Sequence, residues 1–410
     1  MALLRTNRNF RLLFSATAIS NLGDGVSALA FPWLASLITR DPFLIAIVAA
    51  ATRMPWLLFS IPAGVLTDRS DRRRLMVMSD LLRLLLTAGV IALILALPET
   101  PMPGDPLIYI GGLCGLAFLL GTADVVRDNA AQTALPSIVN PADLERANGQ
   151  LWSIEQIMGA LIGPPLAGVL IAYAVPAPFA LDAVTFALAA WAVWLIAVPP
   201  RVVRDKRPLR EEVRAGVMYL WTHPTLRRLA LMLGIINAVA TGSLTVLILI
   251  SQEILGLDGV GHGMLLAAGA AGGVVGGLVC PWVAMRFGPQ RSIFLSLLLF
   301  PVPFLIVALS SNALLIGAAL FLEMMVGMLW NVVTVSYRQR LIPDDLLGRV
   351  NSVYRFFAWG MMPVGALAAG LLVGLAEPGW GREAALRLPY LIAFMVAAGL
   401  AIYGAARLRL

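Results

Sequence analysis

Long apolar stretches alternate with short polar segments along the whole chain. A helix needs roughly 20 mostly apolar residues to cross a bilayer core of about 30 Å, and twelve stretches reach that length. They predict transmembrane helices over 11–38, 43–66, 75–97, 107–127, 148–173, 177–198, 228–252, 262–285, 291–310, 313–337, 349–376 and 386–407. The pattern therefore predicts an all-α polytopic membrane protein with 12 transmembrane helices.

One polar connection is much longer than the others and lies between the sixth and seventh predicted helices. It divides the chain into an N-terminal six-helix bundle over 1–198, a cytoplasmic linker over 199–227 and a C-terminal six-helix bundle over 228–410. Apolar residues recur at helical spacing within the linker, at Leu209, Val213, Val217 and Leu220. This spacing predicts a short amphipathic helix along the membrane surface.

The composition excludes an ordinary soluble domain. Apolar residues make up 60% of the chain and charged residues 13%, whereas average globular chains have roughly 45–50% and about 25%. The formal charge of +7, from 30 Lys and Arg against 23 Asp and Glu, could indicate a nucleic-acid partner. Because the chain has few polar stretches on which those cations could gather, we expect no nucleic-acid binding.

The cations instead indicate the orientation of the chain in the membrane. Short cytoplasmic loops collect Lys and Arg, and placing the N-terminus inside leaves only Arg40, Arg382 and Arg387 in external loops. Both termini are therefore expected in the cytoplasm of a bacterium, with the chain in its inner membrane. The first apolar stretch is too long for the core of a signal peptide, so we expect a retained helix.

Two short repeats indicate that the bundles are related by duplication. The segment 144–149 (Leu-Glu-Arg-Ala-Asn-Gly) corresponds to 347–352 (Leu-Gly-Arg-Val-Asn-Ser). Arg11 followed by Asn21 in the first helix likewise corresponds to Arg227 followed by Asn237 in the seventh. Internal repeats of this kind are common in transporters, and they predict two pseudo-symmetric bundles.

The loop after the second predicted helix, over 64–74, carries a Gly, an Asp-Arg pair and a basic cluster. It resembles the signature between helices two and three of the major facilitator superfamily, although Asp71 stands where that family usually has Gly. The resemblance implies the major facilitator fold and a cytoplasmic gate in which Asp68 and Arg72 pair with Asp124. Its further members would be Gly64, Arg69, Arg73, Asp80 and Arg83, with Arg127 nearby. The alternative is that these arginines only fix the topology.

The fifth predicted helix contains a second pattern that the resemblance explains. Gly159, Gly163, Pro164 and Gly168 resemble the antiporter motif of the superfamily, which occurs mainly in exporters; Ala167 replaces one Gly. Segments 21–25 and 53–56 resemble the drug:proton antiporter branch that contains macrolide-efflux proteins and the enterobactin exporter. The alternative is a plain packing face with a proline kink, since small residues let helices approach closely.

Charged residues near the bilayer centre are costly, so each one predicts a functional site. Asp24 and Arg53 lie near the middles of consecutive helices, and we expect them to form an ion pair; the alternative to a working pair is a static one. Glu323 lies near the middle of the tenth helix with no cation at its depth. An apolar environment favours the neutral form of such a carboxyl, so Glu323 is a candidate for proton coupling or for binding a cationic substrate.

Further polar residues are secondary candidates for proton coupling or substrate binding. Glu155 and Arg355 lie in repeat-related surroundings and are expected to face each other. Asn237 and Asn331 are expected to line a cavity. Asp182, near the outer end of the sixth helix, is expected to be a wetted interface residue.

These patterns favour a secondary transporter. The chain contains no phosphate-binding Gly-rich loop, no metal-ligand set and no catalytic triad pattern, so we expect no enzyme activity, cofactor or metal. The leading hypothesis is proton-coupled export of hydrophobic or amphipathic small molecules by alternating access, performed by a monomer. The alternatives are export of a siderophore or lipid-like metabolite, a non-transporting membrane sensor and, more weakly, membrane-embedded catalysis.

Overall fold

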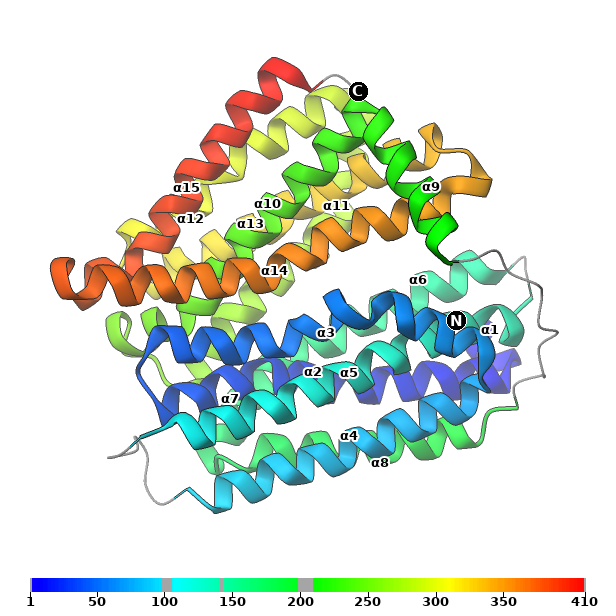
Figure 1. Ribbon diagram of the computed structural model, residues 1–410, viewed down its shortest axis with the longest axis horizontal. Helices are drawn as coiled ribbons and strands as arrows, with labels where there is room; N and C mark the ends of the chain where they lie inside the picture. Colours follow the sequence, from blue (N-terminus) through cyan, green and yellow to red (C-terminus); the bar gives the residue numbers. More distant parts are fainter. Residues whose placement is uncertain (1, 98–104, 141–142, 198–208, 409–410) are drawn as a thin grey trace. The chain divides into compact units, whose positions relative to one another are not determined.

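The computed structural model describes residues 2–97, 105–140, 143–197 and 209–408, and every regular element in these ranges is a helix (Figure 1). The elements are α1 (Ala2–Thr6), α2 (Arg8–Ile38), α3 (Pro42–Arg69), α4 (Arg72–Leu95), α5 (Leu107–Ile138), α6 (Leu144–Glu155), the π-helix η2 (Gln156–Ile162), α7 (Gly163–Tyr173), α8 (Ala177–Trp194), α9 (Leu209–Thr222), α10 (Pro224–Leu249), the π-helix η3 (Ile250–Ile254), α11 (Gly259–Leu299), α12 (Pro301–Leu309), α13 (Ala313–Leu341), α14 (Asp344–Trp380) and α15 (Arg382–Arg407).

Ten helical segments of the described chain are long and apolar enough to cross a membrane, which makes this a multi-pass membrane protein. One of them runs over Gly259–Leu309, where the sequence predicts two helices. The chain bends inside this segment at Gly288, whose φ of 78° is accessible to glycine because it has no Cβ. Pro289 follows directly and has no N–H for a helical hydrogen bond, so the bend lies between the two predicted helices.

Polar caps define where several helices begin. Asn7 accepts a hydrogen bond from the Phe10 N–H at the start of α2, and Asp41 accepts from the Phe43 N–H at the start of α3. Asp71 caps α4 by accepting from the Arg74 N–H at 2.9 Å. The residue that departs from the superfamily pattern is thus an N-cap, a position where Asp is among the preferred residues, and its φ of −66° requires no glycine.

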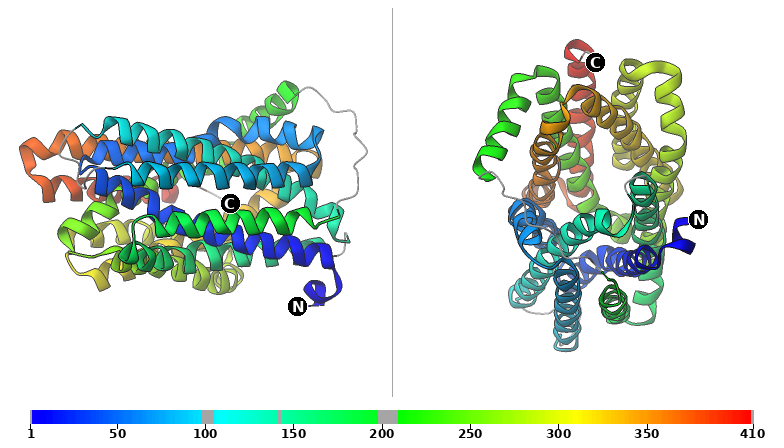
Figure 2. Two further views of the ribbon diagram at one scale, coloured as in Figure 1. Left: turned by 90° about the horizontal axis from the view of Figure 1, so that it is seen from below. Right: turned by 90° about the vertical axis from the view of Figure 1, so that its right-hand side faces the viewer.

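The chain divides into two compact units, residues 1–204 with 257–267 and residues 205–256 with 268–410. In the first unit, α2 packs against α7 and α8, while α4 lies between α5 and α8 and α3 packs on α5. These helices run along one another, as both views in Figure 2 show. Phe10, Leu13, Met76 and Val193 belong to the buried apolar core of this unit.

The second unit is organised around α14, which packs against α10, α15 and α9. Helix α9 falls in the second half of the predicted linker, and the Tyr219 hydroxyl donates to the Leu341 carbonyl at 3.2 Å. Arg382 joins three helix ends, because it forms a bidentate pair with Glu253 at 2.8 and 2.9 Å and a further pair with Glu377 at 2.9 Å. Such bidentate pairs are stronger and more directional than single ones.

Candidate functional site

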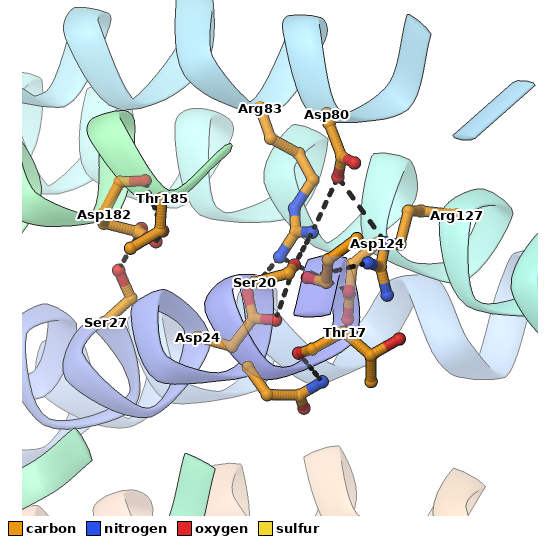
Figure 3. Close-up of polar contacts among 12 residues, drawn as sticks. Thr17, Ser20, Asp24, Ser27, Asp80, Arg83, Asp124, Arg127, Asp182 and Thr185 are labelled. Carbon is orange, nitrogen blue, oxygen red and sulfur yellow. Dashed lines mark hydrogen bonds and ion pairs between the residues drawn. The ribbon is translucent and has the colours of Figure 1, made fainter. Parts of the chain in front are cut away.

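A buried guanidinium on α4 forms the centre of a charged cluster in the first unit (Figure 3). Arg83, with a side chain 3% exposed, pairs with Asp24 of α2, with Asp80 at 3.4 Å and with Asp124 of α5 at 3.5 Å. Asp80 is fully buried and also pairs with Arg127 at 3.5 Å. We call these five residues the Arg83 cluster. Its carboxylates outnumber its guanidinium groups by three to two.

Helical spacing brings these charges together. Asp80 and Arg83 are three residues apart on α4, and Asp124 and Arg127 are three apart on α5, so each pair lies on one helix face. On α2, Ser20 and Asp24 are four apart, and the Ser20 hydroxyl accepts a hydrogen bond from Arg83 at 3.1 Å. The Arg83 guanidinium also lies 3.9 Å from the centre of the Phe186 ring on α8. Four helices of the unit therefore hold Arg83.

The cluster has an open side. The side chains of Asp24 and Asp124 are 35% and 33% exposed, whereas those of Asp80 and Arg83 are buried. Asp24 pairs with Arg83 and not with Arg53, which is the partner expected from sequence. Arg53 is exposed and has no ion pair within 4 Å among the side chains that the structure describes.

The expected gate is also arranged differently. Asp124 pairs with Arg83, deep in α4, while Arg72 donates to the Ser137 hydroxyl at 3.1 Å. Arg73 donates to the Ile196 carbonyl at 3.3 Å. The surroundings of Gly64 and the side chains of Asp68 and Arg69 lie outside what the structure describes. The sequence places Asp24 in an ion pair with Arg53 and Asp124 in a separate gate. In the structure both carboxylates pair with Arg83.

The predicted antiporter motif lies directly against α2 beside this cluster. Its first residues form the π-helix η2, and Gly159 and Gly163 pack on Gly25: a Cβ at Gly25 would lie 2.8 Å from the Gly159 Cα, and one at Gly163 would lie 2.6 Å from the Gly25 Cα. Further along, Gly168 packs on the backbone of Gly259. Pro164 begins α7 in the first turn, where its missing N–H is tolerated.

In the second unit, polar and apolar side chains together line a small cavity of about 60 Å³. Asn237, Ser296, Trp330 and Asn331 line it, and the Trp330 indole N–H has no hydrogen-bond partner among the described residues. Asn237 donates to the Ala358 carbonyl at 2.7 Å. Both predicted asparagines therefore meet at one cavity.

The remaining predicted residues lie apart from this cavity. Glu323 is half-buried in the middle of α13. No residue described in the structure forms an ion pair with it. Glu155 is exposed near the end of α6, and the Arg355 side chain lies outside the described set. No three His, Cys, Asp or Glu side chains in the described ranges could together hold a metal ion.

Asp182 on α8 is the residue whose environment the sequence analysis misjudged most. It is 1% exposed, whereas a wetted interface position was expected. The Ser27 hydroxyl of α2 donates to it, and Thr185 lies beside it. The spacing of Asp182 and Thr185, three residues apart on α8, and of Asp24 and Ser27 on α2 could have indicated two facing polar helix faces.

Known proteins resemble the chain over nearly its whole length. A family model described as "Transmembrane secretion effector" matches residues 1–403. The chain belongs to this family. It is thereby a member of the major facilitator superfamily, which the loop at 64–74 suggested.

Two relatives of this chain are named as exporting proteins. "Multidrug efflux pump Tap" of Mycolicibacterium fortuitum is 27% identical, with 94% of each chain covered. "Enterobactin exporter EntS" of Shigella boydii serotype 4 is 26% identical, covering 92% of this chain and 87% of the relative. A bacterial homologue of the iron transporter ferroportin, solved in an inward-facing state, superposes with a TM-score of 0.77 at 16% identity, over 98% of this chain and 99% of that one. The last similarity shows the fold alone.

Proposed function

We propose that this protein is a proton-coupled exporter of hydrophobic or amphipathic small molecules, working as a monomer by alternating access. It would have twelve membrane-spanning helices in two six-helix bundles, joined by the linker over 199–227, and both termini in the cytoplasm of a bacterial cell. The names of the multidrug efflux pump and of the enterobactin exporter support export. The proposal favours transport over catalysis and over a non-transporting sensor.

The excess of carboxylates in the Arg83 cluster is the observation that supports coupling of export to protons. Three carboxylates meet two guanidinium groups within 4 Å, and burying an unbalanced charge is costly. A bound proton removes the imbalance, and a conformational change that separates Asp24 or Asp124 from Arg83 creates a need for one. Because these two side chains are the exposed members of the cluster, they can exchange protons with water.

The C-terminal unit supplies the complementary features for substrate. Glu323 offers a carboxyl to a cationic group, and a separate cavity in the same unit offers hydrogen-bonding groups from Asn237, Trp330 and Asn331. Most other side chains of the membrane segments are apolar. These features together favour an amphipathic compound with few polar groups.

Transport by the purified protein in inside-out proteoliposomes tests the proposal, with the lipophilic cation ethidium as the probe. We expect an acidic lumen to drive ethidium accumulation as protons leave. Asp24→Asn should reduce that accumulation to the level of empty liposomes, and Glu383→Gln, at an exposed position on α15, should leave it unchanged. Accumulation that persists after a protonophore collapses the gradient would rule out proton coupling.

A second candidate is export of an anionic siderophore or lipid-like metabolite. The exposed Arg53, without a carboxylate partner within 4 Å among the described side chains, favours it, as do relatives named for enterobactin and staphyloferrin A. The same liposomes distinguish the two candidates when they receive a catecholate anion. Arg53→Gln should then abolish transport and Glu323→Gln should spare it, whereas ethidium export requires the opposite pattern.

A further inference from the structure

A second acidic site lies on α8 beside the Arg83 cluster. Asp182, which is 1% exposed, receives a hydrogen bond from the Ser27 hydroxyl, and the Thr185 hydroxyl lies 3.5 Å from its other oxygen. The carboxyl packs directly against the α2 backbone at Gly23. Any side chain at that position would collide with Asp182 and Thr185. Among the residues that the structure describes, the hydrogen bonds to this carboxylate come from hydroxyl groups.

The charged groups nearest to Asp182 belong to the Arg83 cluster. Helix α2 presents Asp24, α4 presents Asp80 and Arg83, and α5 presents Asp124 and Arg127. Helix α7 carries no acidic or basic side chain. Among the described side chains, none forms an ion pair with Asp182 within 4 Å, and a carboxylate buried without a cation is costly. Asp182 is therefore a site that holds a proton while Asp24 is charged.

The geometry also brings Arg83 close to this site. Its guanidinium stacks on Phe186 at 3.9 Å, and Phe186 is four residues after Asp182, on the same face of α8. Asp24 follows Gly23, the residue against which Asp182 packs. Figure 3 shows Asp24 paired with Arg83, and Asp182 in the same region beside Ser27 and Thr185.

We propose that Asp24 and Asp182 share one proton and that Arg83 exchanges between them. This inference rests on the proposed proton-coupled transport. In the arrangement that the structure describes, Arg83 pairs with Asp24, and we assign the shared proton to Asp182. When Arg83 moves about one helical turn along α8, the O–H bond of Asp182 breaks and one forms on Asp24. The proton changes site, the charge of the unit stays constant, and the more exposed carboxyl, Asp24, receives a proton that it can release to water.

Asp182→Asn tests the exchange, because the amide keeps the shape and the hydrogen bonds but cannot give up a proton. In proteoliposomes, gradient-driven ethidium accumulation should be lost while exchange of labelled for unlabelled ethidium without a gradient persists. In infrared spectra of the purified protein, the carbonyl absorption of protonated carboxylic acids should be weaker in Asp182→Asn than in the unmodified chain, because the contribution of Asp182 is lost. Glu383→Gln should retain both signals.

Each result decides a separate statement. Gradient-driven accumulation by Asp182→Asn equal to that of the unmodified chain would overturn the inference, and so would an infrared band unaffected by the substitution. If ethidium accumulation by the unmodified chain does not depend on the proton gradient, the proposed function is wrong. The infrared comparison still reports whether Asp182 holds a proton. Should Asp182→Asn fail to fold, Ser27→Ala replaces it: the infrared band must shift when the hydroxyl is removed, and an unshifted band contradicts the assignment.

Discussion

At the residue scale, Arg83 pairs with more charged side chains than any other member of the cluster. It compensates the buried carboxylate of Asp80 and the half-exposed carboxylates of Asp24 and Asp124. Removing one member of a buried ion pair is more damaging than replacing the whole pair, because the other charge is left uncompensated. The stability of the first unit should therefore depend on this guanidinium.

We expect Arg83→Gln to destabilise the protein by about 3–5 kcal/mol, the usual cost of leaving a buried charge without its partner. The midpoint of thermal unfolding of the purified protein in detergent should fall clearly. Arg74→Gln is the matched control, since Arg74 lies on the same helix and is exposed. Equal unfolding midpoints for the two variants would contradict the role given to Arg83.

The same residues show why the sequence predicted the charged site but not its pairing. Counting residues from helix midpoints gives depth in the membrane at about 1.5 Å per residue, and this placed Asp24 and Arg53 at one level. Depth leaves open the direction in which a side chain points around its helix and which helices are neighbours. Asp24 faces α4, so Arg83 is its partner. Asp182 was expected at a wetted interface because its depth alone was considered. Its burial results from packing against α2, which depth does not predict.

At the scale of the elements, the ten described segments that are long and apolar enough to cross a membrane fall on predicted apolar stretches, because membrane helices are long and apolar throughout. Their interruptions were harder to predict. The π-helix η2 occupies the start of the predicted antiporter motif, and nothing in hydrophobic periodicity distinguishes a π turn from an α turn. The bend at Gly288 was consistent with the polar gap that separated two predicted helices.

The contact between α2 and the motif gives a prediction at this scale. An added methyl group at Gly25 would lie 2.7 Å from the Gly159 carbonyl carbon, and overpacking of this kind costs about 1–3 kcal/mol. The gain in helix propensity from Gly to Ala is roughly 1 kcal/mol, so Gly25→Ala should destabilise the protein and reduce transport. Gly115→Ala is the control, because a Cβ there meets nothing within 4 Å and only the propensity gain remains. Thermal unfolding in detergent measures both, and a stabilised Gly25→Ala would show that the helices can separate freely.

At the scale of the whole molecule, the orientation in the membrane follows from the distribution of arginine and can be tested directly. We expect a membrane-impermeant maleimide added to intact cells to label Glu383→Cys, in a predicted external loop, and not Arg74→Cys, in a predicted cytoplasmic one. Both substitutions are made after Cys114 and Cys280, which are free thiols, have been replaced by Ser. Permeabilised cells should show labelling of both positions, and labelling of Arg74→Cys in intact cells would reverse the topology.

The glycine contacts of α2 also limit how this transporter can adapt. A side chain at Gly25 or at Gly163 would collide with main-chain atoms, so no neighbouring side chain can be shortened to accommodate a larger residue at either of these positions. A directed-evolution library selected for a new substrate range would leave these positions unchanged. Its accepted substitutions would fall instead at exposed polar positions such as Arg53 and Asn331, where a change of side chain alters what the protein can bind without separating its helices.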